Sequence, residues 1–314
     1  VSFNPLCDRR RRSFCSLVHM NKRIVILGPT ATGKSDVGVR LAKKFGGEII
    51  SADSRQVYTG LNIGTGKIPK REMRGVPHHL LDIANPKRQF SVSDYQKHAE
   101  KVIRLIYKNK HVPIIVGGAG LYIDAITKDT TFPAVPPNHA LRKKLGKKSA
   151  AQLFAMLKKK DPARAKTIDS KNPRRLIRAL EIIEVVGKVP KPTTQKRDGV
   201  LYIGLILPPD NLRPKIKQRI ALRMKQGMVA EARALHARGL SYKRMRELGL
   251  EYRFLADLLE KRITKSEFLE QLATAIWQYS RRQMTWFKKN KDIVWFNPKE
   301  LGRIEKKVVT FLKA

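Results

Sequence analysis

One segment of eight residues, 28–35, constrains the fold of this chain more than any other. It reads GPTATGKS and matches the phosphate-binding pattern G-x-x-x-x-G-K-[ST] in full. The apolar run 24–27 precedes it as a short buried strand, and residues 36–45 follow with apolar side chains at helical spacing. In such a strand–loop–helix unit the glycines let the backbone wrap an anion, and the helix N-terminus directs its N–H groups at that anion. The segment therefore predicts a phosphate site.

Two side chains of this segment add to the predicted site. Lys34 supplies a point charge, and the hydroxyl of Ser35 can hold Mg²⁺. The pattern does not identify the ligand that carries the phosphate, since ATP, GTP or a diphosphate leaving group would each fit. The residues predicted to bind the phosphate are Gly28, Pro29, Thr30, Ala31, Thr32, Gly33, Lys34 and Ser35.

Strands and helices alternate after the phosphate segment. The predicted elements are strands at residues 48–52, 78–83 and 112–116 and an amphipathic helix at residues 92–108. This order favours an α/β fold with a parallel sheet, whose ligands bind beyond the carboxyl ends of the strands. Asp53 and Gly117 stand at two such ends.

The pattern changes after residue 135. Residues 138–186 contain no convincing strand and indicate several basic helices. The predicted elements then resume as strands at residues 201–207 and 293–296 and helices at residues 212–238 and 265–290. We therefore predict three parts. They are a disordered basic extension at residues 1–20, a phosphate-loop α/β core with C-terminal helices at residues 21–135 and 197–314, and a helical insertion at residues 136–196.

The charge of the chain is strongly unbalanced. The 314 residues carry 66 Lys and Arg against 26 Asp and Glu, a formal net charge of +40. Residues 136–180 alone hold 14 Lys and Arg and 2 Asp and Glu. Such a surface favours a polyanion, so nucleic acid, an anionic membrane surface and a phosphorylated substrate are the candidate partners. Strand-sized apolar runs and only two cysteines favour a soluble, cytoplasmic protein without a membrane partner, which we expect to be a monomer.

Asp53 is a candidate catalytic residue, because it stands at a strand end about 20 residues beyond the phosphate segment. A carboxylate that faces bound phosphates can accept a proton from a nucleophile or bind magnesium. An N-cap or a ribose contact is the simpler alternative. A flexible glycine-containing stretch follows at residues 60–67, and its Lys67 can be explained as solvated surface.

Six segments together carry a resemblance to a known family. They read GPTATGKS, SADSRQVYTGLNIGTGK, GVPHHLLDI, PIIVGGAGLY, NPRRLIRALE and RRQMTWF, in this order. Their order and spacing closely resemble tRNA dimethylallyltransferases, also called tRNA isopentenyltransferases, from about residue 21 to residue 296. The resemblance implies a P-loop NTPase-like core with a parallel sheet, plus a helical insertion domain that binds tRNA. It also implies that the phosphate loop holds dimethylallyl diphosphate and that the enzyme does not consume ATP.

The activity that the resemblance implies is a prenyl transfer. Members of this family transfer the dimethylallyl group from dimethylallyl diphosphate to N6 of adenosine 37 in tRNAs that read codons starting with U. By resemblance, Asp53 is the general base that takes the proton from N6. Lys34, Arg223 and Mg²⁺ near Ser35 then stabilise the departing diphosphate. Arg219, one helical turn earlier, is the alternative to Arg223.

The resemblance further implies contacts with the anticodon stem-loop of tRNA, whose target adenine has to leave its stack. Ala119 stands where the family usually has Thr, so one hydroxyl is missing. Arg281 and Arg282 are further candidates for the tRNA backbone, whereas Trp286 and Phe287 are expected to pack in the core. A solvated basic helical face is the alternative explanation of the insertion. The residues implied to contact tRNA are Asp53, Ser54, Arg55, Gln56, Ala119, Arg142, Arg174, Arg175, Leu176, Ile177 and Arg178.

Three other functions fit parts of the sequence. An adenylate isopentenyltransferase acting on free AMP, ADP or ATP would share the phosphate loop and the segment at Asp53, but it would not need a basic insertion. A small-molecule P-loop kinase would transfer phosphate from ATP, yet the sequence offers no clear site for its acceptor. A non-catalytic RNA-binding protein would leave Asp53 and Arg223 without a role.

Overall fold

The computed structural model describes residues 21–190 and 194–314, so the predicted extension at residues 1–20 lies outside the described residues. The chain divides into two compact units. The first contains the residues up to Lys128 and from Lys196 onward, and the second is Asp129–Gln195. The predicted insertion covers residues 136–196. The second unit begins seven residues earlier than predicted and ends one residue earlier than predicted.

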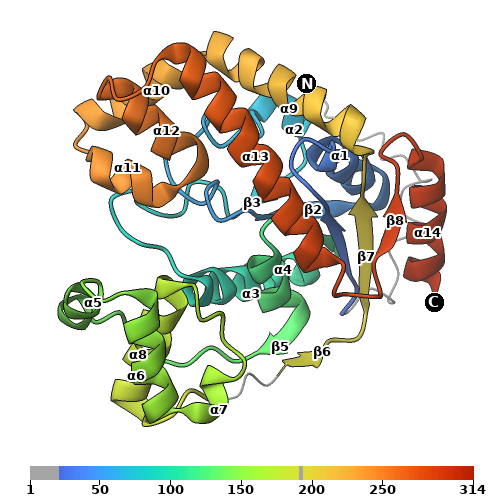
Figure 1. Cartoon of the computed structure of the whole chain (residues 1–314). Helices are drawn as coiled ribbons and strands as arrows, with labels where there is room; N and C mark the ends of the chain where they lie inside the picture. Colours follow the sequence, from blue (N-terminus) through green and yellow to red (C-terminus); the bar gives the residue numbers. More distant parts are fainter. Residues whose placement is uncertain (1–20, 191–193) are drawn as a thin grey trace, which may run out of the picture. The chain divides into compact units, whose positions relative to one another are not determined.

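A six-stranded sheet forms the centre of the first unit (Figure 1). Its strand order is β3-β2-β4-β1-β7-β8, and the paired neighbours run parallel. The predicted parallel α/β architecture is therefore confirmed. Because the carboxyl ends of parallel strands meet at one edge, the segments that follow β1, β2 and β4 converge there. The strands are β1 (Arg23–Leu27), β2 (Gly47–Ala52), β3 (His78–His79), β4 (Val112–Gly117), β7 (Val200–Leu205) and β8 (Val294–Phe296).

Helices cover both faces of this sheet. The helices of the first unit are α1 (Lys34–Phe45), α2 (Lys70–Met73), α3 (Val92–Lys108), α4 (Gly120–Thr127), α9 (Pro209–Lys225), α10 (Met228–Ala237), α11 (Tyr242–Leu248), α12 (Leu250–Leu259), α13 (Lys265–Phe287) and α14 (Leu301–Lys313). Side chains of β1 alternate between the two faces, as a pleated strand requires. Val25 packs in a cluster with α3, α4 and the helices α9 to α13, whereas Ile24 packs with α1 and α14. Among the described residues, none of these helices is long and apolar enough to cross a membrane.

Two predicted elements differ from the structure, each because of a local backbone conformation. The strand predicted at residues 78–83 ends after His79, since Leu80 and Asp82 adopt positive φ values of 63° and 56°. The helix predicted at residues 212–238 is divided into α9 and α10 by Gly227, whose φ is 94°. Left-handed backbone interrupts a right-handed helix and leaves the extended conformation of a strand.

The second unit is built from helices around a small apolar core of its own. Its helices are α5 (His139–Leu145), α6 (Ala150–Lys160), α7 (Pro162–Ala165) and α8 (Pro173–Val186), and the short strands β5 (Lys128–Thr130) and β6 (Thr194–Lys196) pair where the units join. A fully buried carboxylate, Glu181, ties the helices together. It accepts hydrogen bonds from Arg142 Nε at 2.8 Å, Arg178 Nη1 at 2.5 Å and the Asn138 N–H at 2.6 Å. Burial alone would raise the pKa of Glu181, but these donors outweigh burial and lower it to about 2.

A second buried carboxylate, Glu48, is the second residue of β2 in the first unit. Its side chain is 6% exposed and lies 2.6 Å from His79 Nε2 and 2.6 Å from His111 Nδ1. Burial alone would raise the pKa of Glu48, but the hydrogen bonds from His111 and His79 prevail, so its pKa lies below the ordinary 4.5. The carboxylate thereby links β2 to β3 and to the segment that leads into β4.

We predict that Glu48→Gln lowers the free energy of unfolding by about 1 to 2 kcal/mol near pH 6, because one of two buried charge-assisted hydrogen bonds is lost. A folded-state pKa below the ordinary value means that the carboxylate stabilises the fold above pH 4.5 and stops doing so as the pH falls through the lower value. Urea denaturation of both proteins between pH 3 and 7 should therefore show a difference that shrinks below pH 4.5. Glu305→Gln, which removes a surface ion pair with Lys44, is the control. An equal loss in that control would contradict the prediction.

Candidate functional site

The phosphate loop connects β1 to α1 and bends in a way that glycine allows. Gly28 has a φ of 144°, and a Cβ there would lie 2.3 Å from the carbonyl oxygen of Leu205. Gly33 precedes the first helical residue with a φ of 84°. The Thr32 hydroxyl donates to the Pro29 carbonyl at 2.9 Å, which closes the loop on itself. The loop therefore directs its backbone amides and the start of α1 toward the carboxyl edge of the sheet.

Lys34 is the first residue of α1, and its amine donates to the Pro29 carbonyl at 2.6 Å. Burial and the nearby charge of Arg219 together lower the pKa of Lys34 to about 7, although the charge of Asp53 acts in the opposite direction. Lys34, Arg219 and Asp53 thus act on one another at this edge, although they come from distant parts of the sequence. An anion that binds between the two cations would relieve their repulsion.

Asp53 follows β2 directly, as the sequence predicts. Its Oδ1 accepts the N–H groups of Arg55 at 2.8 Å and Gln56 at 3.3 Å, so the carboxylate starts a turn rather than a helix. Among the described residues, no partner is found for Oδ2. Ser54 lies in the same turn and is half-buried. One carboxylate oxygen is therefore held by the backbone while the other is available for chemistry.

Two arginines of α9, Arg219 and Arg223, bind carbonyl groups of the stretch at residues 60–67. Arg223 donates to the Gly64 carbonyl at 2.8 Å and to Glu251 at 3.0 Å, and it is only 5% exposed. Arg219 donates to the Gly66 carbonyl at 3.2 Å. Burial lowers the pKa of Arg219, and Arg223 lowers it further. The structure thus gives Arg219 the electrostatic contact with Lys34, whereas the guanidinium of Arg223 is already paired with a carboxylate.

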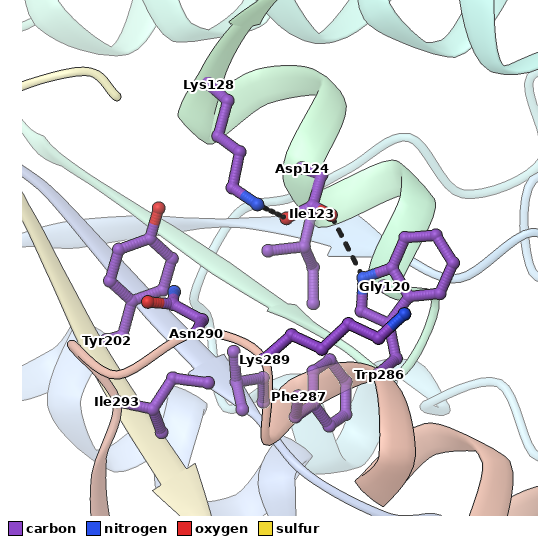
Figure 2. A pocket seen from close by; sticks show the side chains of 11 residues that line it. Gly120, Ile123, Asp124, Lys128, Tyr202, Trp286, Phe287, Lys289, Asn290 and Ile293 are labelled. Atoms are coloured by element: carbon purple, nitrogen blue, oxygen red, sulfur yellow. Dashed lines mark hydrogen bonds and ion pairs between the residues drawn. The ribbon is translucent and has the colours of Figure 1, made fainter. Parts of the chain in front are cut away.

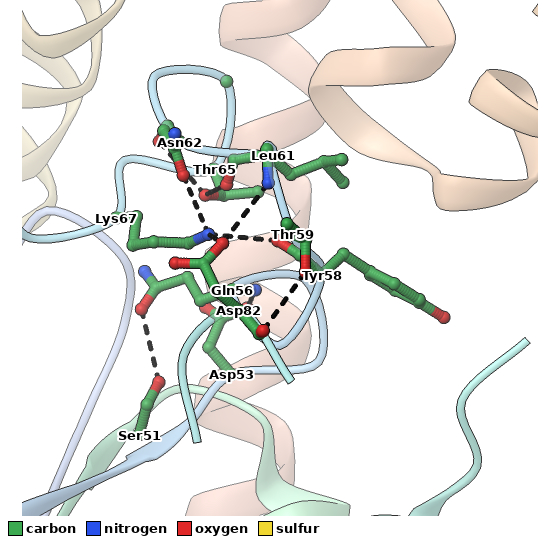
Figure 3. A network of polar contacts seen from close by, with 12 residues as sticks. Ser51, Asp53, Gln56, Tyr58, Thr59, Leu61, Asn62, Thr65, Lys67 and Asp82 are labelled. Carbon is green, nitrogen blue, oxygen red and sulfur yellow. Dashed lines mark hydrogen bonds and ion pairs between the residues drawn. The ribbon is translucent and has the colours of Figure 1, made fainter. Parts of the chain in front are cut away.

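The stretch at residues 60–67 is an ordered loop (Figure 3). Lys67 donates to the Tyr58 carbonyl at 3.0 Å, to Asn62 Oδ1 at 2.9 Å and to Asp82 Oδ1 at 2.6 Å. Its side chain is only 6% exposed, so the interpretation of Lys67 as solvated surface is wrong. Burial lowers the pKa of Lys67, although Asp82 acts in the opposite direction. The hydrogen bonds of Lys67 thus hold this glycine-containing loop in a defined conformation.

Gln283 joins the phosphate loop to the end of β4, and sequence reasoning did not single it out. Its Oε1 accepts the N–H of Thr30 at 3.0 Å, and its Nε2 donates to the Gly118 carbonyl at 2.8 Å. It is 6% exposed, while Arg281 and Arg282 beside it are exposed. The segment RRQ therefore presents two cations outward and one amide inward. The positions of polar residues around the helix could have indicated that Gln283 joins these two segments, but only if the fold was already known.

A pocket of about 120 Å³ lies between α4 and the end of α13 (Figure 2). Asp124 at its wall accepts Trp286 Nε1 at 3.0 Å and pairs with Lys128 at 2.9 Å. A Cβ on Gly120 would lie 2.4 Å from the Trp286 ring, so the two helices need glycine to approach. Phe287 is 3% exposed, which confirms that it packs in the core. These contacts hold α13, and with it Gln283, against α4.

Tyrosines near Asp53 form an aromatic wall that sequence reasoning missed. Tyr95 and Tyr122 stack with their ring centroids 4.1 Å apart, and the Tyr95 hydroxyl donates to the Ser51 carbonyl at 3.1 Å. Burial, together with the charge of Asp53, raises the pKa of Tyr279 to about 12. Burial raises the pKa of Tyr122 in the same way, and Asp53 is among the charges that raise it further. Neutral aromatic side chains thus lie close enough to Asp53 to interact with its charge. Tyr95 and Tyr122 are buried, whereas Tyr279 is half-buried.

The comparisons with known proteins agree with this geometry. The family model described as IPP transferase matches residues 56–290. A tRNA dimethylallyltransferase 2 from Treponema denticola is 41% identical over 282 residues, which cover 88% of this chain and 94% of that protein. A tRNA dimethylallyltransferase from Geobacillus kaustophilus is 40% identical and is matched over 94% of its length. The chain belongs to the tRNA dimethylallyltransferase family.

Solved structures of this family share the architecture. The tRNA isopentenylpyrophosphate transferase of Bacillus halodurans superposes with a TM-score of 0.70 at 34% sequence identity, covering 93% of this chain and 97% of that chain. A eukaryotic dimethylallyltransferase, described as acting on tRNA, has a TM-score of 0.76 and covers 88% of this chain and 73% of that chain. At 24% identity it supports the fold alone. The family fold is P-loop NTPase-like, as the resemblance implied.

The residues that the dimethylallyltransferase resemblance assigns to tRNA contact differ in their environment. Leu176 is completely buried in the core of the second unit, so its side chain packs the helix and cannot meet an RNA. Ile177 packs partly against the same core, and Arg142 and Arg178 bind Glu181. Arg174 and Arg175 are exposed. Arg174 and Arg175 are thus the most exposed cations among the predicted contacts on α8.

In the first unit, Ala119 is assigned to tRNA contact along with the turn that begins at Asp53. It precedes α4 as the N-cap, with no side chain that could cap the helix, and its N–H donates to the Ala52 carbonyl at 3.2 Å. The backbone at Ala119 thus joins the ends of β2 and β4. Its half-buried methyl group packs against the apolar cluster on this face of the sheet.

We predict that Gln283→Leu lowers the free energy of unfolding by about 2 kcal/mol, because the Thr30 N–H and the Gly118 carbonyl lose their partner while buried. The same variant should bind inorganic diphosphate more weakly, since the phosphate loop loses its tie to β4. Urea denaturation and calorimetric titration measure the two effects. Gln278→Leu, at an exposed position of the same helix, is the matched control and should change neither. Equal behaviour of the two variants would show that Gln283 has no special role.

Proposed function

We propose that this protein transfers the dimethylallyl group of dimethylallyl diphosphate to N6 of adenosine 37 in tRNAs that read codons starting with U. One observation carries the proposal. The phosphate loop ends in Lys34, which shares its electrostatic environment with Asp53 and Arg219 at the carboxyl edge of the sheet. Cations for a leaving diphosphate and a carboxylate for a proton are thus placed together, and the family membership of the chain identifies the reaction that needs both.

The diphosphate would lie on the loop amides and the N-terminus of α1, with Lys34 and Arg219 as its nearest cations. As the C–O bond to the prenyl group breaks, the leaving oxygen gains charge, and these groups stabilise it because they are held in place beforehand. Arg223 is the catalytic cation that the resemblance implies. To act as such, it has to share its guanidinium with Glu251, whose carboxylate lies 3.0 Å away.

Mg²⁺ is the proposed cofactor. Among the described residues, no cluster of three or more His, Cys, Asp or Glu side chains could hold a metal by itself. The exposed hydroxyl of Ser35 at the start of α1 fits an ion that is held chiefly by substrate oxygens and water, which is how Mg²⁺ usually binds. When bound, the ion would neutralise charge on the departing diphosphate.

Asp53 would act on the nucleophile. The exocyclic amine of adenine is a poor nucleophile because its lone pair is delocalised into the ring. As the N6–C bond forms, the proton of N6 passes to Oδ2 of Asp53, while Oδ1 stays bound to the N–H groups of Arg55 and Gln56. The products are N6-dimethylallyladenosine in the tRNA and diphosphate. Tyr122 and Tyr279 would flank the flipped adenine.

The test is a prenyl-transfer assay with dimethylallyl diphosphate and Mg²⁺. We expect prenylated adenosine in an unmodified tRNA with an A36-A37-A38 loop and none with free AMP. Modification of AMP without modification of tRNA would show instead an adenylate isopentenyltransferase. Phosphoryl transfer from ATP to either acceptor would show a kinase.

We predict that Asp53→Asn lowers kcat at least about 100-fold, because a general base contributes on the order of 10² to 10⁴ to a rate. Its affinity for tRNA should stay within about twofold, since the amide keeps an oxygen for the two backbone donors. Single-turnover kinetics and filter binding measure these quantities. A variant that keeps its kcat would remove Asp53 as the base.

We predict that changing Arg174 and Arg175 together to Ala weakens tRNA binding and reduces the slope of log K against log salt concentration by about 1.5 to 2, as the loss of two phosphate contacts requires. Arg178 is kept because it holds Glu181. The control changes Lys101 and Arg104 to Ala, which removes two exposed charges from α3 in the first unit. If the slope of log K against log salt concentration changed equally in both proteins, α8 would be only a solvated basic helix.

A further inference from the structure

A half-buried network of hydrogen bonds joins α10 to the loop at residues 60–67, and Glu231 lies at its centre. Oε2 of Glu231 accepts the N–H groups of Asn62 at 3.0 Å and Ile63 at 2.7 Å. Oε1 accepts the N–H of Gly64 at 2.9 Å and the Tyr252 hydroxyl at 2.6 Å. Both carboxylate oxygens are thus used twice. Glu231 lies outside the six segments that carry the family resemblance.

Three consecutive backbone amides that point to one place form a concave site for an anion. In this loop the anion is the protein's own carboxylate. A Cβ on Gly64 would lie 2.6 Å from the Tyr252 hydroxyl, so the loop can approach Glu231 and Tyr252 only with glycine at this position. The path of the loop is therefore determined by Glu231 on one side and by the contacts of Lys67 on the other (Figure 3).

The carbonyl groups of the same loop face the opposite way, toward α9. Gly64 donates its N–H to Glu231 and accepts Arg223 at its oxygen, 2.8 Å away. Two residues later, the Gly66 carbonyl accepts Arg219. Glu231 contacts neither arginine. It acts on them through the path of the loop, because it holds the residues whose carbonyl groups they bind.

From this arrangement we propose that Glu231 is a positioning residue for the diphosphate site. It fixes the loop so that the Gly64 and Gly66 carbonyls hold Arg223 and Arg219 toward Lys34 and Asp53. The inference rests on the proposed function for the identity of the anion that these cations meet. A carboxylate that merely braces two helical segments would stabilise the fold equally, but it would not change how tightly the phosphate loop binds diphosphate.

The test compares wild-type protein with Glu231→Gln. The amide has nearly the same shape, but in either orientation its NH₂ group faces at least one backbone N–H where an acceptor is needed, so the loop has to move. We expect Kd for inorganic diphosphate with Mg²⁺, measured by calorimetric titration, to rise about tenfold. KM for dimethylallyl diphosphate should rise with it, while Kd for tRNA stays within twofold.

Three further variants make the test specific. Glu267→Gln removes a carboxylate that binds the Thr264 N–H at 2.7 Å at the start of α13, so it should lower Tm and leave diphosphate affinity within twofold. Tyr252→Phe removes one of the four donors and keeps the three amides, so Kd should rise less than in Glu231→Gln. Glu231→Asp, which keeps the charge but shortens the side chain, should raise Kd threefold or more and tests the same contact if the Gln variant does not fold.

Two outcomes would overturn the inference. A Glu231→Gln protein with lowered Tm and unchanged diphosphate affinity would leave Glu231 as a brace, and so would a Glu267→Gln protein that loses diphosphate affinity to the same extent. If the wild-type protein itself bound no diphosphate, the proposed function would fall and the inference with it. Unchanged affinity in the variant alone rejects only the role of Glu231.

Discussion

Two half-buried cations, Lys34 and Arg219, lie within reach of each other's charge at the carboxyl edge of the sheet, and the fold has to offset their repulsion. Two carbonyl dipoles and one carboxylate do so. The Pro29 carbonyl accepts a hydrogen bond from the Lys34 amine, and the Gly66 carbonyl accepts one from the Arg219 guanidinium. Asp53 supplies a negative charge. Neither cation has a carboxylate within hydrogen-bonding distance among the described residues. Because both cations lack a bonded carboxylate in the described part of the structure, the arrangement favours the proposed phosphate site over a salt-bridged core.

Each of these offsetting groups depends on an element far away in the sequence. Parallel pairing of β1 with β4 brings the phosphate loop beside Gly118, and Gln283 of α13 joins the two. The carbonyls that hold the arginines belong to a loop whose path is determined from α10. The C-terminal helices are thus more than a cover for one face of the sheet, because they set the positions of charges at its edge. Substitutions there should affect substrate binding as well as stability.

Local patterns in the sequence predicted the parts of the fold that local physics determines. The phosphate loop, the parallel strands around it, Asp53 at a strand end and the helix at residues 92–108 all follow from short-range spacing and were found where expected. The missing parts are long-range. Gln283 bonds residues 253 and 165 positions away, and nothing in its own segment distinguishes an inward amide from a solvated one. Arg219 and Arg223 share one pattern, and only their different carbonyl and carboxylate partners separate them.

The pKa of about 7 at Lys34 has a consequence beyond geometry. Near neutral pH a sizeable fraction of the free protein carries this amine without its proton, and a bound diphosphate favours the charged form. Binding of the substrate is therefore linked to proton uptake from the solvent, and release of diphosphate returns the proton. The affinity of the site becomes a function of pH on the alkaline side of neutrality, through a lysine that in water would stay charged to far higher pH.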